Sequence, residues 1–221
     1  MTDLLGFVLA VAYVFSIIGL AELTRRWRGY GGEYTRKIVH IGVGMLAWIV
    51  PFLFSSPWPF VLAALTFAVI NLLDWRFGFF PAMVSADRTN LGTVYFPLAA
   101  ATVALLFWRQ PPLMVAALMP LTWGDGLASV VGRAYGTHRY AVFGQQRSLQ
   151  GSAAFFVMGG IFTWLALWLL PGPPEIGPAA ALLPALAIVV ATTITEAFSV
   201  YGLDNLTVTA AAVLVLSVWP F

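Results

Sequence analysis

Long apolar runs separated by short polar segments dominate the sequence. A helix needs about 20 apolar residues to cross a bilayer, and charged residues interrupt the chain at nearly that interval. The run from Ile38 to Leu73 is too long for one helix, and its middle segment, Pro51 to Pro59, is typical of an interfacial turn. The pattern predicts eight helices, at residues 4–21, 38–53, 59–73, 91–107, 112–131, 151–170, 179–197 and 205–219.

The composition indicates that lipid surrounds most of these helices. Charged residues make up 9% of the 221 residues, against about 25% in an average soluble domain. Hydrophobic residues make up 61%, which is more than one core of this size can hide from water. We therefore expect an all-α, polytopic membrane helix bundle that forms one domain over residues 1–221. No Lys or Arg precedes the first apolar run, so we expect that run to be a retained span rather than a cleavable signal peptide.

Basic residues predict the orientation of the bundle, because Lys and Arg accumulate in cytoplasmic loops. With the amino terminus outside, 10 of the 11 basic residues fall on the inner side and only Arg109 falls on the outer side. We therefore predict a multi-pass protein of the cell membrane whose polar, cytoplasmic face carries the chemistry. The absence of cysteine excludes thiolate metal sites and cysteine nucleophiles.

The fifth predicted helix carries an acidic residue in an apolar setting. Thr122, Asp125, Ser129 and Arg133 follow one another at three- and four-residue steps, so they share one face near the predicted inner end. Gly124 and Gly126 flank Asp125 and allow a phosphate or another backbone to approach closely. A structural ion pair between Asp125 and Arg133 is the alternative, but carboxylates within membranes are usually functional.

The segment before the sixth predicted helix has the character of a phosphate site. Ser148 is placed to cap the helix, and Arg147 and Gly151 share a face where a phosphate could meet free N–H groups. Ser152 adds a hydroxyl one residue later. Capping alone would explain Ser148 but would not explain the neighbouring arginine and glycine.

A polar stripe begins the second predicted helix. Glu33, Arg36, Lys37 and His40 lie at positions i, i+3, i+4 and i+7, which places His40 about one turn inside the membrane. An ion-paired helix start would explain Glu33 and one basic residue. It would leave His40 unexplained, although a buried histidine can also be a packing residue.

Three further carboxylates lie at the predicted inner ends of helices. Glu196 lies within an apolar run, Asp204 begins the last helix, and Asp87 precedes the fourth. Helix capping is the alternative for Asp87 and Asp204. Mg²⁺ prefers one or two carboxylates together with substrate phosphates, so carboxylates and basic residues on one face suit phosphoryl or nucleotidyl transfer. The chain has no Walker A or protein kinase motif.

Four of these segments together resemble the integral-membrane lipid-alcohol kinases, which include phytol kinase, dolichol kinase and the CTP-dependent diacylglycerol kinase and are related to the CDP-diacylglycerol synthases. The segments are Glu33–His40, Gly124–Gly136, Arg147–Ser152 and Glu196 followed by Asp204-Asn205-Leu206. Members of that family typically have Lys-Ser where this chain has Arg147-Ser148, so a planar guanidinium replaces a point charge.

The resemblance implies transfer of the γ-phosphoryl group of a nucleoside triphosphate, expected to be CTP, to the hydroxyl of a membrane isoprenoid alcohol such as phytol, geranylgeraniol or a polyprenol. It implies Mg²⁺ held by Asp125 with Glu196 or Asp204, and catalytic roles for Asp125, His40 and Glu196. The phosphates are expected at basic residues and at the glycines and serines of the two motifs, namely Arg36, Lys37, Gly124, Gly126, Arg133, Arg147, Ser148, Gly151 and Ser152. The expected partners are the alcohol, the nucleotide and the bilayer, with no nucleic acid.

Other functions remain open at this stage. A cytidylyltransferase that forms a CDP-lipid, or a CTP-dependent diacylglycerol kinase, would use the same metal and phosphate ligands. A transporter would place polar residues near the bilayer midplane and show internal repeats, whereas the polar residues here gather at one interface. The residues do not distinguish among the alcohols or the nucleotides, and they leave the oligomeric state open.

Overall fold

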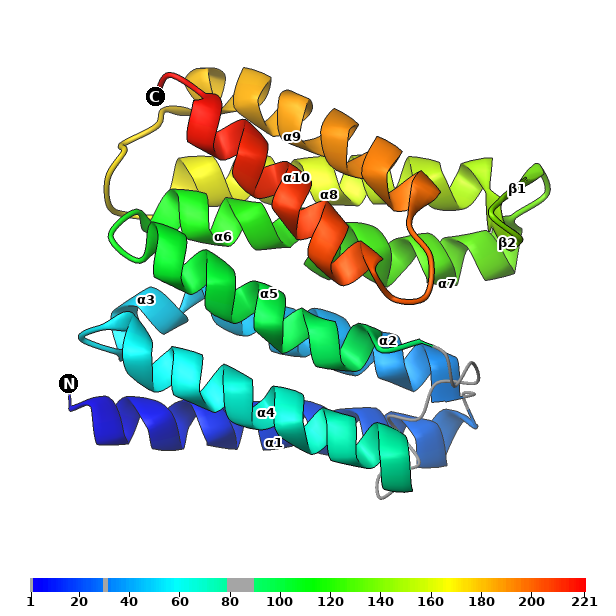
Figure 1. The fold of residues 1–221 in the computed structure, drawn as a ribbon, viewed down its shortest axis with the longest axis horizontal. Coiled ribbons are helices and arrows are strands. Elements are labelled where there is room, and N and C mark those ends of the chain that lie inside the picture. The colour runs from blue at the N-terminus through cyan, green and yellow to red at the C-terminus, as the bar shows by residue number, and fades with distance from the viewer. Residues whose placement is uncertain (1, 30–31, 79–89) are drawn as a thin grey trace.

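The computed structural model describes residues 2–29, 32–78 and 90–221, and over these residues the protein is a bundle of long helices (Figure 1). The predicted helical membrane bundle is confirmed. The chain crosses the bundle eight times within the described residues, as predicted, and the N and C termini lie at the same end in Figure 1. Asp87 and Arg88 lie outside the described residues.

The first half of the chain forms four passages. They comprise α1 (Asp3–Arg28), α2 (Gly32–Met45) continued by a 3₁₀ turn and α3 (Val50–Leu53), α4 (Pro57–Phe77) and α5 (Gly92–Phe107). The predicted break at Pro51 to Pro59 is present, because α3 ends at Leu53 and Pro57 begins α4. Proline suits the first turn of a helix, where its missing N–H has no helical partner.

The second half forms the other four passages. They comprise α6 (Pro111–Met119) with α7 (Gly126–Tyr135), then α8 (Leu149–Leu169), α9 (Pro178–Phe198) and α10 (Asp204–Val218). A π-helical turn, Pro120–Asp125, joins α6 to α7, so these two helices make one passage. Five helical segments of the described chain, α1, α4, α6–α7, α8 and α9, are long and apolar enough to cross a membrane.

The segment between α7 and α8 is a β-hairpin, where the sequence predicts only a polar loop. β1 (Arg139–Val142) pairs with β2 (Gln145–Ser148) in antiparallel register. Phe143 and Gly144 between them both have positive φ, at 47° and 79°, as a two-residue type I′ turn requires. Phenylalanine is an unusual residue for this turn, so the sequence carries no strong hairpin signal.

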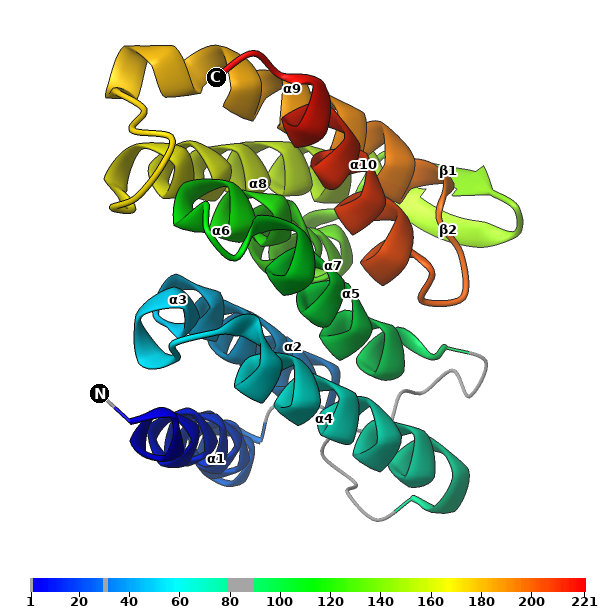
Figure 2. The same ribbon diagram turned by 60° about the vertical axis from the view of Figure 1, so that its left-hand side comes forward.

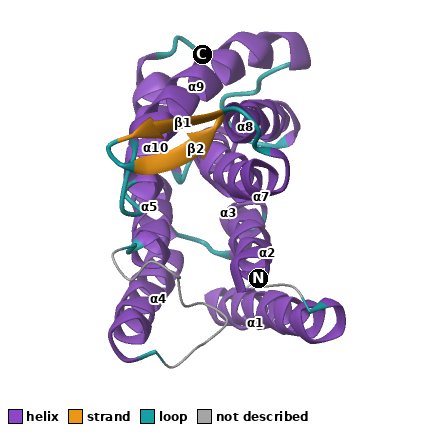
Figure 3. Cartoon of the chain, turned by 90° about the vertical axis from the view of Figure 1, so that its right-hand side faces the viewer, coloured by secondary structure: helices purple, strands orange, loops and turns teal. Residues whose placement is uncertain are grey.

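The hairpin lies at the opposite end of the bundle from the termini (Figure 1), and Figure 3 looks onto this end, where β1 and β2 lie in front of the helices. The same end holds the last turns of α1 and α4 and the first turns of α2 and α5, whereas Arg109, between α5 and α6, lies at the end with the termini. The described basic residues of the predicted inner side are therefore grouped at one end. We refer to this as the hairpin end.

The bundle consists of a packed part and a hollow part. In Figures 1 and 2, α6 to α10 lie together on one side, α1 to α4 lie on the other side, and α5 runs between them. The main apolar core is centred on α5 and α6, where Val103, Ala104, Val115 and Ala116 are fully buried. A cavity opens between α1, α2, α4 and α5.

Candidate active site

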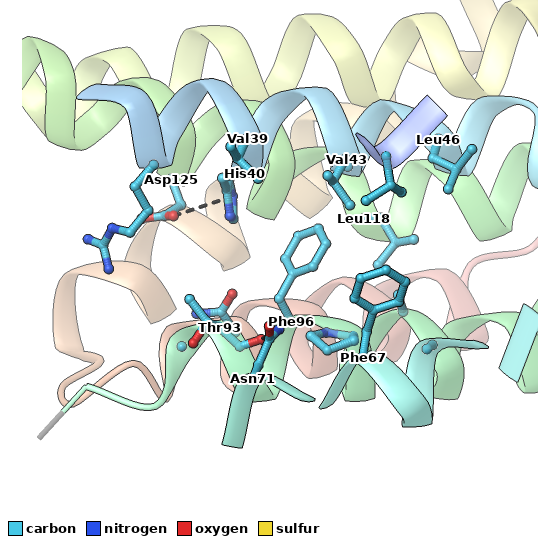
Figure 4. Close-up of a pocket in the computed structure, with 18 of the residues that line it drawn as sticks. Val39, His40, Val43, Leu46, Phe67, Asn71, Thr93, Phe96, Leu118 and Asp125 are labelled. Atoms are coloured by element: carbon cyan, nitrogen blue, oxygen red, sulfur yellow. Dashed lines mark hydrogen bonds and ion pairs between the residues drawn. The ribbon is translucent and has the colours of Figure 1, made fainter. Parts of the chain in front are cut away.

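One cavity extends from the hairpin end into the bundle, with a volume of about 410 Å³. Its polar part is lined by side chains from α2, α4, α5, α7, the hairpin and α10, and its apolar part by α1, α2, α4 and α5. Figure 4 shows this change of character, with Asp125, His40, Thr93 and Asn71 at one end and Val43, Leu46, Leu118 and Phe67 at the other. The cavity therefore suits an amphipathic molecule that has a polar head and an apolar tail.

Asp125 stands at the polar end, where the π-helical turn meets α7. Its Oδ2 accepts a hydrogen bond from Lys37 Nζ at 2.7 Å, and His40 Nε2 lies 3.5 Å from the same oxygen. The side chains of Asp125 and Lys37 are only 15% and 11% exposed. Asp125 therefore lies beside the polar stripe of α2, and its partner is Lys37 and not Arg133, the partner in the alternative interpretation.

The π-helical turn explains how Asp125 comes so close to α2. Pro120 begins it, and proline removes an N–H that an α-helix would use. Glycines allow the close approach of the two elements: a Cβ on Gly44 would lie 2.5 Å from Thr122 Oγ1, and one on Gly126 would lie 2.5 Å from Ile41 Cγ1. A π-turn within a helix often marks a functional site.

His40 is held in one orientation by a backbone carbonyl. Its Nε2 lies 2.9 Å from the Leu121 carbonyl oxygen, which can only accept, so we assign the proton to Nε2. In the neutral ring, Nδ1 is then an acceptor that has no partner among the described residues. The ring also packs on Phe96, with centroids 4.9 Å apart (Figure 4).

Two arginines that line the same end of the cavity each have one buried N–H group without a partner among the described residues. They are Arg36 and Arg147, and the group is Nε in each. Arg36 pairs with Glu33 at 2.9 Å. Arg147 pairs with Glu196 and donates through Nη2 to the Ser199 carbonyl at 2.6 Å.

Glu196 therefore lies against Arg147 and does not line the cavity. Its side chain is 5% exposed, so the ion pair is almost enclosed by protein. In this arrangement Glu196 orients a cation from the hairpin rather than presenting an oxygen to the cavity.

Asp204 is the second carboxylate that lines the cavity. Its Oδ1 accepts from the backbone and side-chain nitrogens of Asn205, both at 2.9 Å. The turn before α10 packs on the start of α5, where a Cβ on Gly202 (φ 80°) would lie 2.5 Å from Gly92 N. This contact brings Asp204 to the polar end.

The remaining predicted phosphate residues lie outside the cavity lining. Arg133 is 54% exposed and pairs with Glu33 at 3.0 Å. Ser148 caps α8 by accepting from Gly151 N at 3.1 Å, and Ser152 bonds to the Tyr140 hydroxyl at 2.7 Å. A Cβ on Gly151 would lie 2.9 Å from the Ala128 carbonyl oxygen, and one on Gly124 would lie 3.0 Å from the Phe155 ring. These contacts give the two glycines a helix-packing role.

Several polar residues of the cavity were missed by reasoning from the sequence. Asn71 donates to the Thr93 carbonyl at 2.8 Å and joins α4 to α5, and Gln145 and Gln146 of the hairpin also line the polar end. A lone asparagine within the apolar α4 is itself a signal, because polar residues within a membrane span are costly.

Two carboxylates facing one cavity fit a hard cation. Within the described residues, no cluster of three or more His, Asp and Glu residues could hold a metal by protein ligands alone. Mg²⁺ does not need one, since it binds through one or two carboxylates together with substrate phosphates and water. Asp125 and Asp204 each have one oxygen that is not engaged by another described residue.

Comparisons with known proteins identify the family. The chain is 32% identical to a phytol kinase of Synechocystis sp. over 209 residues, which cover 94% of this chain and 88% of the relative. This protein belongs to the phytol kinase family. It is also 29% identical to a probable chloroplastic phytol kinase of Triticum aestivum, over 94% of this chain and 74% of the relative. A chloroplastic farnesol kinase of Arabidopsis thaliana is 26% identical over 72% of this chain and 55% of the relative.

The resemblance read from the four motifs is thus confirmed at the level of the family. No family model matches the chain, and no solved structure matches it. The relatives' names describe isoprenoid alcohol kinases.

Proposed function

We propose that this protein transfers the terminal phosphoryl group of a nucleoside triphosphate, with CTP as the first candidate, to the hydroxyl of an isoprenoid alcohol in the membrane. Membership of the phytol kinase family makes it a lipid-alcohol phosphotransferase. The observation that supports this function most strongly is a cavity with Asp125 and two arginines at one end and an apolar interior beyond.

The polar end has the features that a triphosphate requires. Arg36, Lys37 and Arg147 supply positive charge at this end, and the planar guanidinium group of arginine suits a phosphate. The first turns of α5 and α10 also reach the cavity, through Gly92 and Asp204, and helix N-termini favour anions. Asp125 and Asp204 would hold Mg²⁺, which when bound neutralises charge on the phosphate oxygens.

The alcohol would enter with its hydroxyl beside His40 and its chain along the apolar part of the cavity. The hydroxyl oxygen attacks the γ-phosphorus, the bond from that phosphorus to the β-bridging oxygen breaks, and the nucleoside diphosphate leaves. Nδ1 of His40, the free acceptor of the neutral ring, takes the hydroxyl proton. Phosphoryl transfer needs mainly positioning and charge neutralisation, which the buried cations supply.

An assay of the purified protein tests this function directly. Labelled CTP, ATP, GTP and UTP are each incubated with phytol, geranylgeraniol, farnesol and diacylglycerol, in the presence and absence of Mg²⁺. We expect an isoprenoid alcohol to gain phosphate with release of a nucleoside diphosphate. Release of pyrophosphate with a CDP-lipid product would instead support the cytidylyltransferase, and phosphorylation of diacylglycerol alone would contradict the assigned alcohol.

We further propose that the hairpin end faces the cytoplasm of the cell membrane. The grouping of the described basic residues at this end supports the orientation. Labelling of a single cysteine at Phe143, in a chain that otherwise has none, by an impermeant reagent in intact and in lysed cells tests it. We expect labelling only after lysis.

A further inference from the structure

Three aromatic side chains line the end of the cavity away from Asp125. They are Phe7 of α1, Phe54 between α3 and α4, and Phe60 of α4. We call these three residues the floor. Phe54 is buried, at 6% exposure, although it lies in a connecting segment.

The floor is fixed in place by contacts between α1 and the α3–α4 connection. Asp3 accepts hydrogen bonds from the Ser55 amide and the Ser55 hydroxyl, both at 2.8 Å. A Cβ on Gly6 would lie 3.3 Å from Phe54 Cδ1 and would clash with the Leu53 carbonyl. The glycine thus lets α1 lie directly on the segment that carries Phe54. A second anchor, the Tyr13 hydroxyl to the Gly42 carbonyl at 2.8 Å, holds α1 against α2.

The length of the cavity between its polar end and the floor can be measured along two helices, α1 and α4, and the two values agree. The residues that line it extend from Ile18 to Phe7 along α1 and from Asn71 to Phe60 along α4. At 1.5 Å per residue, each stretch is about 16 Å long. An isoprene unit of four carbon–carbon bonds advances about 5 Å when extended, so the cavity holds roughly three extended units, and a fourth when the chain is kinked.

We propose that the floor limits the length of the isoprenoid chain that this enzyme accepts. This inference rests on the proposed function and names the residues that determine which alcohols are accepted. Alcohols of three or four isoprene units fit between His40 and Phe54, whereas longer polyprenols meet the three aromatic rings. Residues of the floor therefore act on specificity and not on the phosphoryl transfer itself.

The test compares the length profile of the purified wild-type protein with that of variants at the floor. Phe54→Ala and Phe60→Ala deepen the cavity, so we expect kcat/KM for polyprenols of five or more units, relative to geranylgeraniol, to rise at least about tenfold. Ala63→Phe, on the cavity wall in α4, narrows it. We expect this variant to lose at least about tenfold on geranylgeraniol relative to geraniol. Phe52→Ala is the matched control, because Phe52 is 50% exposed in the same segment and does not line the cavity.

Different results of this test would overturn the length limit and the proposed function. The proposed length limit would be overturned if the floor variants kept the wild-type length profile. It would also be overturned if the wild-type protein accepted long polyprenols as well as geranylgeraniol, because the chain would then leave the cavity between helices without meeting the floor. A wild-type protein that phosphorylates no alcohol of any length would overturn the proposed function instead. Size-exclusion chromatography in detergent checks each variant. The variants on α4 test the floor independently should Phe54→Ala fail to fold.

Discussion

Small residues have opposite effects on packing in the packed part and the hollow part of the bundle. Between α7 and α8, glycines bring backbones together: a Cβ on Gly151 would lie 3.4 Å from Gly132 Cα and 2.9 Å from the Ala128 carbonyl oxygen. Between α1, α2, α4 and α5, alanines such as Ala47 and Ala64 instead line an open cavity. Small side chains permit close contact where helices converge and leave room for a cavity where no other side chain fills the space between them. Both sides supply the charged end, with Lys37 from α2 and Asp125 and Arg147 from the packed side, whereas the hollow side accommodates an apolar chain.

The charged end should be the most sensitive to substitution. We expect Asp125→Asn to lower kcat/KM by roughly 10²–10³-fold, because it removes one of the two carboxylates that would hold Mg²⁺ and leaves Lys37 without its charged partner. The measurement is alcohol phosphorylation by purified protein. Ser129→Ala, one turn away on the cavity wall, is the control and should lose much less. Normal turnover by Asp125→Asn would contradict the central role given to this residue.

Removal of the proposed proton acceptor should have the next largest effect. His40→Phe keeps an aromatic ring beside Phe96 but has no nitrogen, so we expect kcat to fall by about 10²-fold while KM for the alcohol changes little. Steady-state kinetics with the alcohol varied measure both constants. A variant that keeps its kcat would show that His40 is only a packing residue.

The ion pair behind the cavity should affect nucleotide binding more than turnover. Glu196→Gln leaves Arg147 without a charged partner, so we expect KM for the nucleotide to rise by about tenfold through loss of positioning, with kcat changing less. Arg147→Lys, which restores the residue typical of the family, should keep most of the activity. A tenfold fall of kcat with an unchanged KM for the nucleotide would instead indicate that Glu196 acts at the reacting atoms.

The packed side should respond in stability rather than in chemistry. Gly151→Ala places a methyl group against the Ala128 carbonyl, so we expect a loss of about 1–3 kcal/mol in the free energy of unfolding, measured by denaturant titration in detergent. Gly19→Ala in α1, where a Cβ meets nothing within 4 Å, is the matched control. If Gly151→Ala kept the wild-type stability but raised KM for the nucleotide, Gly151 would have the phosphate-binding role that the sequence predicts.

The sequence predicts the passages well because apolar length and charge spacing reflect the bilayer directly. The predicted helix at 91–107 corresponds to α5, and that at 205–219 to α10, within one residue at each end. The first helix instead continues past residue 21 to Arg28, because Glu22 pairs with Arg25 and Arg26 on its surface. The π-helical turn before Asp125 depends on packing against α2, which no periodicity encodes.

The candidate site could be predicted only in part. Asp125, Lys37 and His40 could be found as ionisable groups at membrane depth, and they do lie together. The pairing of Glu196 with Arg147 depends on the hairpin, whose Phe143-Gly144 turn carries a weak signal. The cavity itself depends on how α1 and α4 are placed relative to α2 and α5, and the pattern of a single sequence does not specify this placement.

Photolabelling tests whether one continuous cavity holds both the isoprenoid chain and the hydroxyl group that is phosphorylated. A geranylgeraniol analogue with a diazirine at the chain end is irradiated in the purified protein, and the labelled peptides are identified by mass spectrometry. We expect labelling at Phe54 and Phe60, and we expect it to be lost when unlabelled geranylgeraniol competes. Labelling confined to lipid-facing side chains such as Leu62 and Leu65, unaffected by competition, would contradict this expectation.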